Sequence, residues 1–184
     1  NFGKDVAVRL GRQPIAFGNQ GGWLYNGLEG YDGAQVAYNN GKLALTTGFG
    51  QLNASDWKDF KITIDDEDYT AKGVTGADMY FAKAGYDFGF AKLGADYVKF
   101  QGDIEKSDTY VAGQELYGIN LNIPVQQFNV FGEYWKNTTL GDFDTAWNAG
   151  LSYGKADWKK AGTWDLSVAY NDVDAGAYFG GGTW

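Results

Sequence analysis

The sequence contains no cysteine and no histidine, and these two absences exclude much of enzyme chemistry. Without cysteine the chain forms no disulfide and offers no thiolate to a metal ion. Without histidine it lacks the commonest general base, the usual partner of a nucleophilic serine and the commonest metal ligand. Carboxylate pairs also catalyse hydrolysis, as in glycosidases, but the sequence does not fix the separation of Asp96, Glu133 and Asp165. We therefore expect neither an enzyme nor a bound cofactor.

Long hydrophobic runs and clusters of positive charge are lacking as well. No stretch approaches the roughly 18 consecutive apolar residues that a membrane-spanning helix requires. The formal net charge is −8, whereas nucleic-acid phosphates call for clustered lysine and arginine, so we expect no nucleic-acid partner. The chain begins at Asn1, which is neither an initiator methionine nor the start of a signal peptide, and we interpret it as a piece of a longer protein.

The chain is rich in glycine and aromatic residues, and its informative pattern is an alternation with a period of two. Apolar and small or polar residues alternate strictly over 117–123, 147–153 and 164–170. Because successive side chains of a strand point to opposite faces, each segment has one apolar face and one polar or tiny face. Weaker copies of the pattern occur at 6–10, 34–38, 43–46, 80–88, 91–97 and 128–134. Together they predict about nine strands of roughly ten residues, the length that a tilted strand needs to cross a bilayer.

The connections between these segments alternate between short and long. Short turns are expected at 39–41, 87–89, 123–126 and 155–162, and longer connections at 13–27, 53–76, 102–113 and 138–144. Such alternation is expected of an up-and-down transmembrane barrel, and not of a Greek-key sandwich. We therefore predict an all-β fold, an antiparallel up-and-down transmembrane β-barrel. Residues 1–184 would supply about nine of about 16 strands, with a long extracellular loop at 53–76. The alternative is a closed barrel of about ten strands that uses 175–184.

The two faces of the strands predict which side of the barrel meets lipid. Aromatic residues gather near strand ends, where rings with a polar tip favour the headgroup zone, although aromatics are also good strand formers in general. The opposite face is rich in glycine, serine and asparagine, which suits a crowded wet lumen; a small soluble barrel would instead fill its inside with apolar side chains. The expected lumen-facing polar residues include Asp5, Gln35, Asn120, Asn129, Asn148 and Asn171. The expected charged pore-lining residues are Arg9, Arg12, Lys42, Lys83, Lys92, Asp96, Glu133 and Asp165.

Two segments carry a resemblance to a known family. The first segment is Val8-Arg9-Leu10-Gly11-Arg12-Gln13-Pro14, the second is Gly30-Tyr31-Asp32-Gly33-Ala34-Gln35-Val36, and a glycine- and aromatic-rich stretch lies between them. The chain here resembles general diffusion porins of Gram-negative outer membranes. The chain is similar in particular to the barrel portion of S-layer-homology-linked outer-membrane porins of diderm Firmicutes. In such porins a strand that ends in this way leads into a loop inside the barrel. The resemblance implies a constriction loop at 13–29, opposite basic residues of the wall. The residues implied in the constriction are Gln13, Trp23, Tyr25, Glu29 and Asp32.

The same resemblance implies an activity, a location and partners. The activity is passive diffusion of small hydrophilic solutes and ions through a water-filled pore in the outer membrane. The partners are membrane lipid and lipopolysaccharide, two further copies in a homotrimer, and peptidoglycan, bound through a region absent from this chain. The strip Ala82, Ala84, Ala91 and Ala95 is a candidate subunit contact and equally a candidate for lipid-facing filler. Because Glu29 and Asp32 lie in a segment without lysine, we expect a weak preference for cations.

Three other interpretations stay open at this point. An envelope-tethering or structural outer-membrane barrel, with an incidental or plugged pore, shares the strand pattern. A soluble carbohydrate-binding β-protein with exposed tryptophans is a further alternative. The acidic run Asp65-Asp66-Glu67-Asp68 is a weak candidate for binding Ca²⁺ through Asp65, Asp66 and Asp68, but it lacks the spaced ligands and the glycine of an EF-hand. A solvated acidic loop explains it as well, and we expect no metal site.

Overall fold

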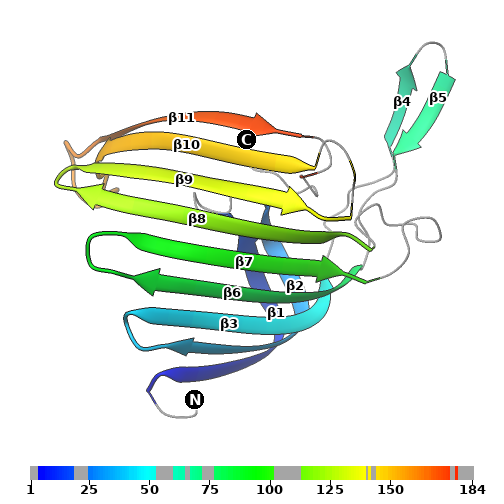
Figure 1. Ribbon diagram of the computed structural model, residues 1–184, viewed down its shortest axis with the longest axis horizontal. Helices are drawn as coiled ribbons and strands as arrows, with labels where there is room; N and C mark the ends of the chain where they lie inside the picture. Colours follow the sequence, from blue (N-terminus) through cyan, green and yellow to red (C-terminus); the bar gives the residue numbers. More distant parts are fainter. Residues whose placement is uncertain are drawn as a thin grey trace.

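The computed structural model describes residues 4–18, 25–52, 60–64, 67–71, 77–101, 113–139, 141, 144–174 and 177, with the backbone alone for 25–29, 52, 60–64, 67–71 and 77. Its strands are β1 (Val6–Phe17), β2 (Tyr25–Asn39), β3 (Leu43–Leu52), β4 (Phe60–Ile64), β5 (Glu67–Ala71), β6 (Ala77–Asp87), β7 (Lys92–Phe100), β8 (Glu115–Val125), β9 (Phe128–Asn137), β10 (Thr145–Gly154) and β11 (Asp165–Val173). Nine strands form one antiparallel sheet in the order β1-β2-β3-β6-β7-β8-β9-β10-β11, and β4 and β5 form a separate hairpin (Figure 1). Over the described residues the large sheet is not closed, and β1 and β11 are its edges.

Each of the nine segments predicted from the alternation falls, to within one residue, in a different strand of this nine-stranded sheet. The prediction of an all-β, antiparallel, up-and-down arrangement is therefore confirmed. The short turns β2–β3, β6–β7, β8–β9 and β10–β11 lie along one edge of the strands, which we call the short-turn rim (Figure 1). The longer connections leave from the opposite ends of the strands, which we call the long-connection rim.

Local side-chain chemistry explains the short turns. In the β2–β3 turn the Asn39 Oδ1 atom accepts from the Gly41 amide at 2.8 Å, and the Asn40 Oδ1 atom accepts from the Leu43 amide at 2.8 Å. In the β6–β7 turn the Asp87 carboxylate accepts from the Gly89 amide at 2.7 Å. Gly41 and Gly89 have φ angles of 90° and 89°, a region that glycine enters without strain. The β8–β9 turn begins later than predicted, because Pro124 still belongs to β8 and Gln126 takes the positive φ.

The segment 13–29 is mostly a hairpin rather than an irregular loop, which corrects the predicted form. β1 and β2 remain paired as far as Phe17 and Tyr25. Their register changes where Pro14 faces residues 28–30, so β2 carries extra residues and the hairpin bends. Gly30 has a φ of 72°, and a Cβ atom there would collide with the carbonyl oxygen of Gln13. The bend sends the end of the hairpin behind β6 to β8 (Figure 1).

The curled sheet has two chemically different faces. On its convex face large apolar side chains are exposed along the strands, as at Leu10 (78%), Ile119 (58%) and Val168 (68%), and in the described strands charged residues occur only toward the long-connection rim. The concave face carries the alternate set, in which glycine and polar residues predominate toward the short-turn rim. Leu121, Leu151 and Leu166 are all exposed on the convex face, so the described residues form no core on that side. The buried apolar cluster of the described residues lies on the concave face.

An apolar cluster fills the concave face toward the long-connection rim, and the sequence reading did not predict it. Phe17, at the end of β1, makes edge-to-face contacts with Phe81 of β6 and Trp135 of β9, with ring centroids 6.1 and 6.2 Å apart. Tyr31 packs against Phe81 in the same way at 5.5 Å. Each such ring pair stabilises the fold by about 0.5–1.5 kcal/mol beyond the contribution of the apolar area that it buries. The cluster consists of Ile15, Phe17, Tyr31, Met79, Phe81, Val98, Phe100, Leu116, Trp135, Ala146 and Ala177.

Candidate functional site

A polar hollow of about 540 Å³ lies on the concave face between the hairpin end and the short-turn rim. We call it the wall hollow. β2, β3, β6, β7 and β8 supply its wall, and Gly18 contributes from the end of β1. Its polar side chains are Asn39, Lys42, Thr46, Lys83, Asp87, Lys92, Asp96, Asn120 and Asn122. Four of the predicted pore-lining residues, Lys42, Lys83, Lys92 and Asp96, are thereby brought together.

Two of these residues hold the end of β1 against the wall. The Lys83 ammonium donates to the carbonyl oxygen of Ala16 at 2.6 Å and lies 5.5 Å from the centroid of the Phe17 ring. It also lies 3.9 Å from Asp96, whose carboxylate accepts from the amide of Gly18. Asp96 is only 7% exposed. Lys83 and Asp96 therefore act as positioning residues for the hairpin, in addition to lining the hollow.

Glu133 organises a second polar group on the concave face. It is 5% exposed, and it accepts from the Trp135 indole at 3.3 Å and from the Asn148 amide at 3.1 Å. These contacts orient the Trp135 ring against Phe17. A buried carboxylate requires such donors, because an unpaired buried charge is costly. Glu133 was predicted to line the pore, and the structure places it beneath the side chains that it orients.

Glycines on the concave face let large side chains lie flat along the wall. A Cβ atom at Gly48 would overlap the Phe81 ring, one at Gly118 the Trp135 ring, and one at Gly150 the Phe131 ring. The Asn120 amide lies over Gly94 in the same manner. Each pair joins neighbouring strands, so a missing side chain on one strand makes room for a large one on the next. This arrangement explains why the strand residues that face the concave side include so many glycines.

The remaining predicted residues divide between the two faces. Arg9 and Asp165 lie on the concave face, whereas Arg12 and Asp32 pair with each other at 2.9 Å on the convex face, away from the hollow. Gln13 is 6% exposed, and its side-chain amide atoms have no hydrogen-bond partner among the described residues. Trp23 and the side chains of Tyr25 and Glu29 lie outside the described residues.

The acidic run of the 53–76 segment is not defined by the structure. Asp65 and Asp66 lie outside the described residues, as does the side chain of Asp68, although Asp68 itself belongs to β5. The segment includes the β4–β5 hairpin, which the sequence reading missed. Among the side chains that are described, no three acidic groups gather closely enough to hold a metal ion.

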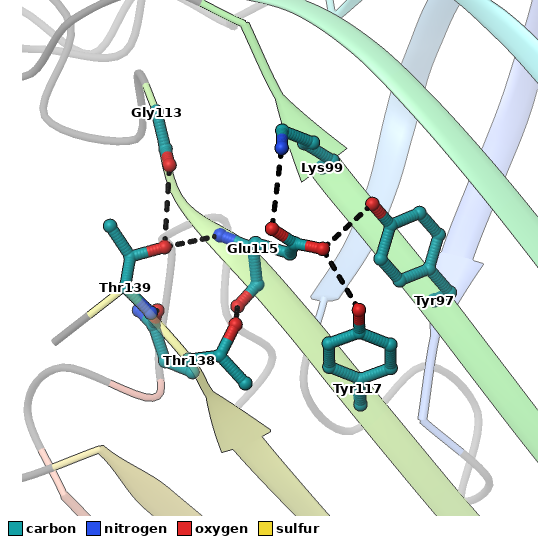
Figure 2. Close-up of polar contacts among 8 residues, drawn as sticks. Tyr97, Lys99, Gly113, Glu115, Tyr117, Thr138 and Thr139 are labelled. Carbon is teal, nitrogen blue, oxygen red and sulfur yellow. Dashed lines mark hydrogen bonds and ion pairs between the residues drawn. The ribbon is translucent and has the colours of Figure 1, made fainter.

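The convex face carries a polar cluster at the long-connection rim. Glu115 accepts hydrogen bonds from the Tyr97 and Tyr117 hydroxyls, both at 2.9 Å, and from the Lys99 ammonium at 3.3 Å (Figure 2). The backbone of Glu115 is held by two threonines: the Thr138 hydroxyl donates to its carbonyl oxygen at 3.1 Å, and the Thr139 hydroxyl accepts from its amide at 2.9 Å. Two tyrosine rings thus lie on the apolar face with their hydroxyls turned toward a charged rim.

Comparison with models of protein families finds no match, and a search of curated proteins finds no significant similarity to the chain. In the part of the chain that the structure describes, no helix has the length and apolarity needed to cross a membrane.

Proposed function

We propose that the chain forms part of the wall of a water-filled outer-membrane β-barrel, through which small hydrophilic solutes and ions diffuse passively. The observation that carries this proposal is the convex face, on which large apolar side chains are exposed from β1 to β11. Apolar surface left in water loses about 25 cal/mol per Å² relative to burial, and soluble monomers rarely expose contiguous patches of this extent. Against lipid acyl chains the same surface carries no such penalty.

The vertical order of the convex face also fits a bilayer. In the described strands its charged residues occur only toward the long-connection rim, at Arg12, Asp32, Asp78, Lys99, Glu115, Lys136 and Asp172. Aromatic rings follow at Phe49, Tyr80, Tyr97, Tyr117, Tyr134, Trp147 and Tyr170, and a second group lies toward the short-turn rim at Tyr38, Tyr86, Phe128, Tyr153 and Trp164. Small and aliphatic residues occupy the space between. Two aromatic girdles around an apolar band are the surface of a transmembrane β-barrel.

Closure of such a barrel places a condition on the strands that join the two edges. β1 and β11 both run from the short-turn rim to the long-connection rim. A direct joint between them would be parallel, so a fully antiparallel barrel needs an odd number of further strands. Added to the nine strands of the sheet, an odd number gives the even total of bacterial single-chain barrels.

In this proposal the concave face lines the lumen and the β1–β2 hairpin narrows it. The wall hollow leaves polar room on the short-turn side of the hairpin, and the apolar cluster occupies the other side. The porin resemblance adds the remaining parts of the proposal. These are lipid and lipopolysaccharide around the barrel, association of three copies, and attachment to peptidoglycan through a region outside this chain.

A structural barrel is the second candidate, and the apolar cluster favours it. Ring contacts among Phe17, Phe81 and Trp135 fill the concave face at one level, as a plug would. A barrel closed at that level would anchor the envelope without conducting. Measurement of solute flux separates the two functions.

The test of the proposed function combines membrane extraction with flux. We expect the protein to stay with membranes through a carbonate wash, to leave them in detergent, and to admit neutral sugars into liposomes in a swelling assay. Retention in the membrane without sugar flux would favour the structural barrel. Release by carbonate alone would contradict a transmembrane barrel and favour a soluble β-protein.

A further inference from the structure

We propose that the wall hollow is a binding site for a small oxyanion of the phosphate type. The inference rests on the proposed function, because it gives the pore a solute class and a place of contact. It follows from which polar groups of the hollow are already engaged and which remain available. Among the charged groups, both carboxylates are engaged, whereas the Lys42 ammonium forms no ion pair within the described part of the chain.

The donors without a partner in the described part of the chain come from the β2–β3 turn, from β3 and from β8, which β6 and β7 separate from β3. The side-chain amine of Lys42 forms no hydrogen bond or ion pair within the described part of the chain, and the same is true of the Asn120 amide and the Thr46 hydroxyl. Lys42 follows β2, Thr46 belongs to β3 and Asn120 to β8, yet all three line one hollow. A lysine ammonium offers three N–H donors and no acceptor, so its natural ligand is an oxygen anion.

Both carboxylates of the hollow have partners. The Asp87 carboxylate receives the Gly89 amide at 2.7 Å and lies 3.5 Å from the Lys92 ammonium. Asp96 receives the Gly18 amide and faces Lys83. Three lysines thus face two carboxylates, and each carboxylate has its own lysine. Lys42 acts on Asp87 electrostatically but forms no ion pair within the described part of the chain. The lining therefore holds three ammonium groups and two carboxylates, and this balance favours an anion over a cation.

Space and position also suit an oxyanion. Gly85 and Gly94 form part of the wall, and the hollow of about 540 Å³ holds a phosphate group together with water or a small organic remainder. Gly18 at the end of β1 lines the same hollow, so a solute that passes the hairpin contacts it. Of the two acidic residues that favoured cations in the sequence, Asp32 is paired with Arg12 on the convex face, and the side chain of Glu29 lies outside the described residues. At this wall a solute meets three lysines and two carboxylates, which leave one positive formal charge in excess.

The test measures the ion current through the reconstituted protein at increasing concentrations of inorganic phosphate. We expect phosphate to reduce the chloride current saturably, and a sugar phosphate to compete where the parent sugar does not. Lys42→Gln should weaken the apparent affinity for phosphate about fivefold, which corresponds to about 1 kcal/mol. Lys155→Gln is the matched control, because Lys155 is an exposed lysine after β10 at the same rim and does not line the hollow.

Two outcomes would overturn the site: phosphate block that does not saturate, or equal affinities in the Lys42→Gln and Lys155→Gln variants. Equilibrium binding of phosphate to the detergent-purified protein is measured in parallel by calorimetry. Binding that depends on Lys42 without any current would uphold the site while the proposed pore fails. Sugar flux without Lys42-dependent phosphate binding would uphold the pore while the site fails.

Discussion

At the residue scale, glycines on the concave face let large neighbouring side chains lie flat against the sheet. Large side chains such as Trp135 and Phe81 would project into the space enclosed by the curl if they stood upright on their strands. Bare backbone at Gly118 and Gly48 lets them lie against the neighbouring strand instead. The rings gain contact with the sheet, and the volume in front of them stays available to water or solute.

Substitution of Gly118 tests this pairing. Gly118→Ala should lower the free energy of unfolding by about 1–3 kcal/mol, because the new methyl group overlaps the Trp135 ring, which is 1% exposed and has little room to move. Gly85→Ala is the control on the same face, since its nearest neighbour would lie 3.9 Å from the added carbon. Urea unfolding followed by tryptophan fluorescence gives both values. Equal losses in the two variants would show that the cost comes from the backbone and not from the ring.

At the element scale, the β1–β2 hairpin is the part that most departs from a regular sheet. The bend depends on Gly30, where positive φ and the approach of the Gln13 carbonyl both exclude a side chain. Lys83 and Asp96 then hold the end of β1 in place. A hairpin fixed at its base and at its end defines the width of the space beside it.

Gly30→Ala should release the hairpin from the concave wall. Gly11 lies in β1 with a φ of 93°, but a Cβ atom there would meet nothing within 4 Å, so Gly11→Ala isolates the cost of φ alone. That cost is about 1 kcal/mol, and we expect a clearly larger loss of stability for Gly30→Ala. In bilayers Gly30→Ala should also raise the conductance above that of the parent protein, whereas Gly11→Ala should not. A conductance unchanged in both variants would contradict the hairpin as the narrowing element.

The Glu115 cluster joins β7, β8 and the residues that follow β9 at the long-connection rim (Figure 2). Glu115→Ala removes the acceptor of two tyrosine hydroxyls, and we expect a loss of roughly 1 kcal/mol in the free energy of unfolding. The Lys99 contact adds little because both partners are solvent-accessible. Asp172→Ala serves as control, since Asp172 lies on the convex face of β11 toward the same rim. Similar unfolding midpoints in urea for both variants would contradict a stabilising role of the Glu115 cluster.

The strands and their faces could be predicted from the sequence because a period of two is a local property. Alternation over 117–123 or 147–153 identifies a strand without knowledge of its neighbours. The bend at residues 28–30 could not be predicted in this way, because a bulge interrupts the alternation and resembles a loop. Parity also does not give height along a strand, so Phe81 and Lys83 share a face while one is buried and the other borders the hollow. Arg12 was predicted to line the pore, but the alternation along β1 places it on the convex face, where it pairs with Asp32.

At the scale of the whole molecule, the account depends on which face of the curled sheet meets lipid. The convex face has the exposed apolar side chains, two groups of aromatic rings and a charged rim. The concave face has the polar hollow and the hairpin. A soluble sandwich would cover the convex face with a second sheet or with helices, and in the described residues nothing covers it.

Accessibility of neighbouring residues on one strand tests this claim most directly, and the absence of cysteine makes the experiment clean. Ile119 and Asn120 are adjacent in β8 and point to opposite faces. In reconstituted membranes, Asn120→Cys should react with a water-soluble, membrane-impermeant thiol reagent, and Ile119→Cys should stay unreactive until the bilayer is removed and the protein is unfolded. Rapid labelling of Ile119→Cys together with protection of Asn120→Cys would contradict the account.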